Sequence, residues 1–161
     1  MRRGKEDRTA KPGDDCFVLG SIVWGERYIR NFMEINVRSL LAPGNLPALR
    51  DQGPVVHVIV TTEAGREAIT SHPVMDRLAT TVTAVKFIVV PDNLIQELMT
   101  GRLRKEFYIF YGMLDHCNIH YAKGMGAYLF MNTVDAVVAD GSLANMAAYR
   151  HQGYECCGGG N

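Results

Sequence analysis

The chain alternates between short apolar runs and longer segments in which apolar residues recur every three to four positions. Four runs have the continuous, partly β-branched character of buried parallel strands: Phe17–Trp24, Val55–Val60, Thr81–Val90 and Ala127–Asn132. Between and after them lie seven segments with helical periodicity: Glu26–Leu41, Leu46–Asp51, Glu63–Thr70, Pro73–Leu78, Asp92–Met99, Phe107–Met125 and Ser142–Gln152. This order predicts an α/β protein with a Rossmann-like, mainly parallel sheet and helices on both faces.

Capping and turn residues support the boundaries of several of these elements. Thr62 and Asp92 stand where an N-cap is expected, directly before helical segments. Gly126 is expected to stop the long helix, and Gly153 to stop the last one. After that glycine, Tyr154–Cys157 could open a fifth strand.

The length and composition are those of one globular domain. The chain has 161 residues, of which 47% are apolar, enough for a buried core. Residues 16–157 are interpreted as this domain. Residues 1–15 mix basic and acidic side chains and are expected to form a flexible tail, and the glycine-rich residues 158–161 a frayed end.

The charge balance and the cysteines exclude several functional classes. Seventeen basic and seventeen acidic residues cancel, so we expect no nucleic-acid partner, whereas weak electrostatic repulsion favours a homo-oligomer. No apolar stretch has the roughly 18–20 residues needed to span a bilayer. The cysteines form no CxxC pair and are interpreted as reduced thiols of a cytoplasmic protein: Cys16, Cys117, Cys156 and Cys157.

Candidate binding residues follow the strands, because an open parallel sheet binds ligands beyond its carboxyl edge. The fourth strand is followed by Asp135, whose carboxylate is suited to Mg²⁺ or Mn²⁺. A further acid, Asp140, lies in a turn and serves either as a turn residue or as an N-cap. The first two strands are followed by an aromatic ring, hydroxyls and carboxylates that suit a nucleotide: Trp24, Gly25 and Glu26, and Thr61, Thr62 and Glu63.

Several common catalytic motifs are missing from the sequence. There is no GxxxxGK[ST] loop and no GxGxxG after the first strand, which disfavours classical ATP and NAD sites. No GxSxG motif marks a nucleophilic serine. His116 and His120 are four residues apart, but they do not form an HExxH motif. His57 lies within an apolar strand and is interpreted as a core histidine with its hydrogen bonds satisfied.

Taken together, several stretches resemble the nucleotide-diphospho-sugar transferase superfamily, the GT-A-type glycosyltransferases. The matching residues are Val23–Tyr28, the run Ser39–Leu49 (SLLAPGNLPAL), Thr61-Thr62 and Val134–Leu143. The resemblance implies a nucleotide-diphosphate sugar as substrate. Its base would lie near Trp24–Glu26 and Thr61–Glu63, and Asp135 would stand at the metal-binding DxD position. Here Thr133 makes that motif TxD, and the chain resembles only the N-terminal, nucleotide-binding half, so the predicted fold is GT-A-like but truncated.

Three functional hypotheses follow from the sequence. The first is a glycosyltransferase-like domain that binds a nucleotide-diphosphate sugar and transfers the sugar with help from a divalent metal. The second is a non-catalytic GT-A-like interaction module that oligomerises through an exposed sheet edge. The third is a metal protein that uses Asp115, His116 and His120.

Overall fold

The computed structural model describes residues 16–100 and 106–150. Its four strands are β1 (Phe17–Ile22), β2 (Val55–Thr62), β3 (Ala84–Val90) and β4 (Tyr128–Asn132). The helical elements are α1 (Glu26–Asn31), the π-helical η1 (Phe32–Asn36), α2 (Val37–Leu40), α3 (Leu46–Gln52), α4 (Glu63–Thr70), α5 (Val74–Thr81), α6 (Asp92–Met99), α7 (Phe107–Met125) and α8 (Ser142–Tyr149).

The strands form one sheet in the order β3-β2-β1-β4, and every neighbouring pair is parallel. Phe17 opens the register of the central strand, opposite Val55 on one side and Tyr128 on the other. The predicted parallel sheet is therefore confirmed. The two central strands are buried along their whole length, which explains why their apolar residues lie on both faces rather than alternating with polar ones.

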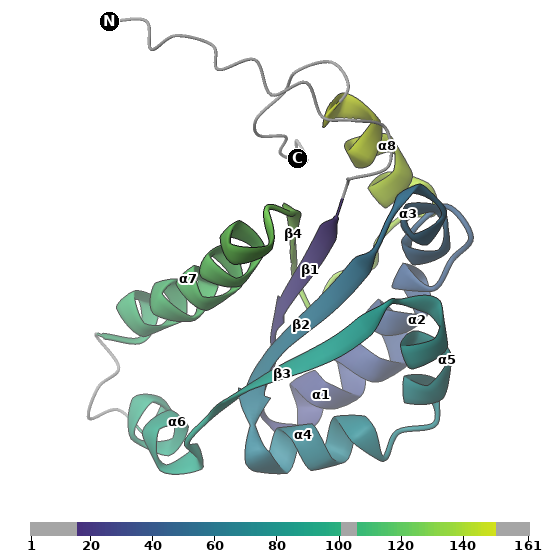
Figure 1. The fold of residues 1–161 in the computed structure, drawn as a ribbon. Coiled ribbons are helices and arrows are strands. Elements are labelled where there is room, and N and C mark those ends of the chain that lie inside the picture. The colour runs from purple at the N-terminus through teal and green to yellow at the C-terminus, as the bar shows by residue number, and fades with distance from the viewer. Residues whose placement is uncertain (1–15, 101–105, 151–161) are drawn as a thin grey trace, which may run out of the picture.

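Helices cover both faces of this sheet, as predicted (Figure 1). Helices α1–α5 and α8 lie on one face, and α6 and α7 lie on the other. Alternate residues of β1 point to opposite faces of the sheet. Phe17 and Leu19 belong to the larger core under α1–α5, while Val18 and Ile22 pack toward α6 and α7. Each face of the sheet is thus sealed from water by an apolar layer.

The direction in which the chain winds changes at β1. The first crossovers carry the chain from β1 to β2 and on to β3, and the crossover through α6 and α7 returns it to β4 on the opposite side of β1. The connections leaving β1 and β4 therefore diverge at the carboxyl edge. Such a topological switch point opens a crevice, which is where doubly wound sheets bind their ligands.

Three predicted boundaries are corrected by the structure. Thr81 closes α5 instead of opening β3, and its hydroxyl donates to the carbonyl oxygen of Arg77 one turn earlier in that helix. Asp92 is the first helical residue and Pro91 the N-cap, since the fixed φ of proline suits the turn into a helix. The helix predicted over Glu26–Leu41 is interrupted by η1.

Other boundary predictions are confirmed. The hydroxyl of Thr62 accepts the backbone N–H of Gly65 at 3.1 Å and caps α4. Gly126 adopts a left-handed conformation, with φ of 63°, and ends α7. The predicted tail over residues 1–15, the fifth strand at Tyr154–Cys157 and the end over 158–161 lie outside the described residues. Within the described ranges, no helix is both long and apolar enough to cross a membrane.

Candidate functional site

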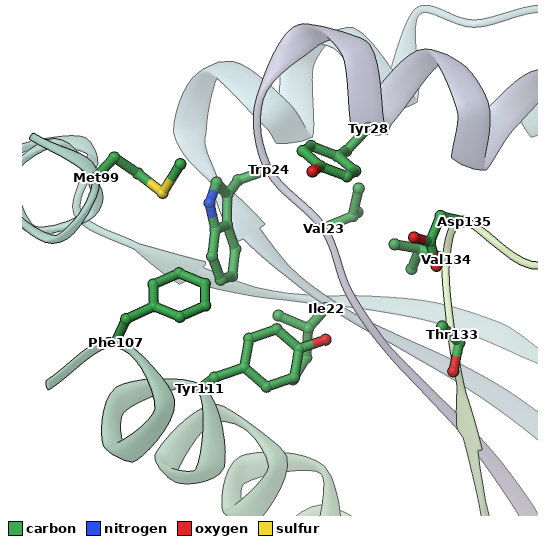
Figure 2. A pocket seen from close by; sticks show the side chains of 10 residues that line it. All are labelled: Ile22, Val23, Trp24, Tyr28, Met99, Phe107, Tyr111, Thr133, Val134 and Asp135. Carbon is green, nitrogen blue, oxygen red and sulfur yellow. The ribbon is translucent and has the colours of Figure 1, made fainter. Parts of the chain in front are cut away.

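A cavity of about 230 Å³ lies at the carboxyl ends of β1 and β4, at the switch point of the sheet (Figure 2). Its walls come from the end of β1, the start of α1, the segment after β4, and the helices α6 and α7. Ten residues line it: Ile22, Val23, Trp24, Tyr28, Met99, Phe107, Tyr111, Thr133, Val134 and Asp135. A side-chain-lined cavity thus lies where the topology predicts a crevice.

Aromatic rings form one wall of the cavity. The ring centroid of Trp24 lies 6.0 Å from that of Tyr111 and 6.4 Å from that of Phe107. The centroids of Phe107 and Tyr111 are 6.2 Å apart. Phe107 and Tyr111 are four residues apart on α7, so they share one face of that helix. Large apolar rings at such distances provide a surface on which another planar group can stack.

Polar groups gather on the opposite wall. Figure 2 shows Thr133 and Asp135 facing the aromatic rings across the cavity, with the hydroxyl of Tyr111 pointing toward them. Burial, together with the carboxylates of Asp115 and Asp135, raises the pKa of the Tyr111 hydroxyl above its usual range. At neutral pH this hydroxyl is therefore a neutral hydrogen-bond donor beside a carboxylate.

The structure brings together two of the predicted site residues. Trp24 and Asp135 both line the cavity, although they are far apart in the sequence. Gly25 follows directly and has φ of 79°, a left-handed conformation that glycine adopts without strain. The carboxylate of Glu26 is exposed and accepts a hydrogen bond at 2.7 Å from Arg30 on the same helix, so it does not join the cavity wall.

The three candidates at the carboxyl end of β2, where Thr61 and Thr62 are the last strand residues and Glu63 opens α4, do not line the cavity. Thr61 is completely buried, and its hydroxyl lies where a Cβ on Gly65 would collide with it. Thr62 caps α4 through its hydroxyl, and Glu63 forms an ion pair with Arg66. Thr62 and Glu63 thus have structural partners, whereas the hydroxyl of Thr61 has no hydrogen-bond partner among the described residues. Contact of these side chains with a nucleotide stays a prediction.

The buried side-chain amide of Asn36 forms hydrogen bonds to the segment that carries Asp135. The side-chain nitrogen of Asn36 donates to the carbonyl oxygens of Thr133 at 3.1 Å and Ala136 at 2.7 Å. It also pairs with the side-chain amide of Asn132, at 3.2 Å and 2.9 Å in the two directions. Asn36 is completely buried at the end of η1, and π-helical turns often occur at functional positions.

The far part of the same loop is held by the run Ser39–Leu49. The side-chain nitrogen of Asn45 donates to the carbonyl oxygen of Ala139 at 3.1 Å, and its oxygen accepts the N–H of Leu143 at 3.1 Å. The carboxylate of Asp140 accepts the N–H of Gly44 at 2.7 Å, so this acid is a tertiary tether rather than a helix cap. Two of the sequence blocks that carry the family resemblance thus contact each other and shape one loop.

The core histidine belongs to the same buried polar group. Asn132 donates at 2.9 Å to the hydroxyl oxygen of Ser21, which lies 2.8 Å from Nε2 of His57. Burial lowers the pKa of His57 to about 3. The prediction of a satisfied core histidine holds for Nε2 only, because Nδ1 has no hydrogen-bond partner among the described residues.

The histidine pair on α7 does not form a metal centre in the described part of the chain. The rings of His116 and His120 lie 6.3 Å apart, as expected for two residues one helical turn apart. Among residues 16–100 and 106–150, no three His, Cys, Asp or Glu side chains are grouped so that they could hold a metal ion. This includes Asp135, the one carboxylate among the described residues that line the cavity.

Sequence reasoning missed four residues of the cavity wall: Tyr28, Met99, Phe107 and Tyr111. Their helical segments were predicted correctly, and the i, i+4 spacing of Phe107 and Tyr111 marked a shared aromatic face. Nothing local indicates that this face lies over the end of β1, because the long crossover from β3 to β4 decides that position.

Comparisons of the chain with protein family models, with curated proteins and with solved structures found no match.

Proposed function

We propose that the cavity at the switch point binds the base of a nucleotide-diphosphate sugar. The observation that carries this proposal is the wall of three aromatic rings at the carboxyl ends of β1 and β4, where doubly wound sheets bind nucleotides. A nucleobase offers a flat π-surface that stacks on such rings, and Tyr111 adds a neutral donor for a polar edge of the base.

The size of the cavity limits how much of the ligand it encloses. Its volume of about 230 Å³ is below the roughly 300–1,000 Å³ of pockets that surround a whole drug-sized ligand. We therefore expect the base to be enclosed and the diphosphate and sugar to extend past the polar wall formed by Thr133 and Asp135. This order along the ligand agrees with the resemblance to GT-A-type enzymes.

The charge of the site predicts a requirement for a cation. Among the described residues that line the cavity, Asp135 contributes a carboxylate and none is a lysine or an arginine, so these residues would repel a bare diphosphate. One carboxylate is too small a donor set to retain a divalent ion, but Mg²⁺ commonly binds to one or two carboxylates together with substrate phosphates. Asp135 would hold such an ion only with the ligand, and the ion would neutralise the diphosphate.

The sole tryptophan of the chain makes a direct test available. Because Trp24 lines the cavity, its fluorescence should change when UDP-glucose, GDP-glucose or CDP-glucose is titrated in the presence of Mn²⁺, and calorimetry should give the same affinity. Mn²⁺ alone should produce no saturable heat. Asp135→Asn should weaken binding and remove its dependence on Mn²⁺. No fluorescence change and no heat with any of the three probes would refute the proposal.

Sugar transfer is a further step that the same samples can test. Release of free nucleoside diphosphate, with water or added sugars as acceptors, would assign transferase activity. Tight binding without release would assign a binding domain that does not turn its ligand over.

A second candidate function is that of a non-catalytic interaction module. The observation that favours it is the apolar surface on α7, where the side chains of Tyr108, Ile109 and Met113 are 84%, 69% and 61% exposed. Exposed apolar groups of this size on a helix often mark a contact with another protein. Light scattering of the unmodified chain and of Met113→Glu separates the two functions, because only an interaction module would lose mass with the variant.

A further inference from the structure

The two backbone carbonyls that accept hydrogen bonds from Asn36 lie on either side of Asp135, whose side chain lines the cavity. Thr133 and Ala136 stand on either side of the dipeptide Val134–Asp135, and the N–H of Ala136 donates to the carbonyl oxygen of Thr133 at 3.1 Å. A backbone hydrogen bond therefore closes a tight turn, and the buried amide of Asn36 binds both of its ends. This turn presents Asp135 at the cavity wall.

The orientation of the Asn36 amide is fixed by these contacts. Carbonyl oxygens only accept hydrogen bonds, so the NH₂ group must face Thr133 and Ala136, which leaves the amide oxygen to accept from Asn132 at 2.9 Å. Asn132 also donates to the hydroxyl oxygen of Ser21, and that hydroxyl forms a hydrogen bond with Nε2 of His57. One chain of hydrogen bonds thus connects the turn with the centre of the sheet.

This chain ties the turn to rigid elements. Ser21 lies on β1, His57 on β2 and Asn132 on β4, and Asn36 ends the π-helical turn η1 on the covering layer. Ser21, Asn36 and His57 are completely buried, which limits the access of water to these hydrogen bonds. A loop carbonyl held by such a network cannot move without leaving a buried polar group unpaired.

We propose that Asn36 is the positioning residue of the site, which fixes the Val134–Asp135 turn so that the carboxylate of Asp135 stays at the cavity wall. Binding groups work best when their supporting residues are themselves locked by packing and hydrogen bonds. The proposal rests on the proposed function only for the identity of the ligand. Its first test therefore needs no ligand.

Hydrogen–deuterium exchange of the folded chain measures the turn directly. Asn36→Ser removes the amide and leaves room for water, and it should speed exchange of a peptide that covers residues 133–138 by about 10-fold or more while β2 stays protected. The matched control is Asn45→Ser, which removes a second completely buried amide that binds Ala139 and Leu143. This control should speed exchange over residues 138–143 and leave the turn at residues 133–136 protected.

Ligand binding then tests whether the turn acts through Asp135. With UDP-glucose, GDP-glucose and CDP-glucose plus Mn²⁺ as probes, Asn36→Ser should weaken the affinity about 10-fold, the size typical of residues that orient a binding group. In an Asp135→Ala background, the same substitution should change the affinity less than 2-fold. A general loss of structure would lower the affinity in both backgrounds.

Each outcome has one meaning. A folded Asn36→Ser variant with unchanged exchange over residues 133–138, or with equal affinity losses in both backgrounds, overturns the proposal. If exchange rises but the unmodified chain binds none of the three probes, the proposed function fails while the positioning role is supported. If Asn36→Ser does not fold, the unmodified chain decides, because exchange of residues 133–138 at the rate of an unstructured peptide overturns the proposal.

Discussion

Acid should destabilise this protein through a single buried side chain, His57. It is completely buried in β2, between the ring of Phe32, whose centroid is 6.0 Å away, and the hydroxyl of Ser21. Burial lowers the pKa of His57 from 6.5 to about 3, whereas in the unfolded chain it titrates near its ordinary value.

The direction of the change in stability with pH follows from which state of the chain binds a proton at His57. Below pH 6.5 the unfolded chain binds a proton at His57 and the folded chain does not, so stability falls with pH until the folded pKa of about 3 is reached. Each pKa unit corresponds to about 1.4 kcal/mol, so the complete effect approaches about 5 kcal/mol. Between pH 7.5 and pH 5, before most carboxylates titrate, His57 should account for a loss of about 2 kcal/mol.

Urea denaturation followed by circular dichroism at pH 7.5, 6.5, 5.5 and 5.0 measures this loss. The matched variant is His57→Gln, which does not titrate and keeps an acceptor for Ser21. It should be less stable than the unmodified chain at pH 7.5, but its stability should fall about 2 kcal/mol less on going to pH 5. Parallel pH profiles for the two proteins would show that His57 is not the acid-sensitive group.

Three substitutions test the packing that surrounds the site. Gly20→Ala should destabilise the protein by about 1–3 kcal/mol, because the added Cβ would lie 2.8 Å from Cγ of Asn118. In a double-mutant cycle measured by urea denaturation, Asn118→Ala should relieve most of that loss. Gly44→Ala should lower the melting temperature and speed hydrogen exchange over residues 140–145, because the added Cβ would lie 2.6 Å from the backbone nitrogen of Gly141. An unchanged melting curve would contradict that contact. Thr62→Ala should lower the free energy of unfolding by about 1 kcal/mol through loss of the α4 cap, and Thr62→Ser should restore most of it.

The sequence predicted one side of the site because that side depends on local rules. Trp24 ends an apolar run, and Asp135 closely follows another. Parallel strands bring their carboxyl ends to the same edge of the sheet. The predicted strands and their parallel arrangement were therefore enough to place both residues near one cavity. The same reasoning also selected Thr61 and Thr62, because a strand end does not reveal which face a side chain takes or which helix it caps.

By itself, then, the sequence determined the α/β class, the parallel sheet and most helix boundaries, because hydrophobic period and turn chemistry act over a few residues. Only the tertiary structure decided that β4 pairs with β1, that the aromatic face of α7 closes the cavity, and that Asn36 holds the turn of Asp135. The last contact joins residues 100 positions apart. Such contacts arise when buried polar groups must find partners in the folded chain, and no local pattern in the sequence records which partners they find.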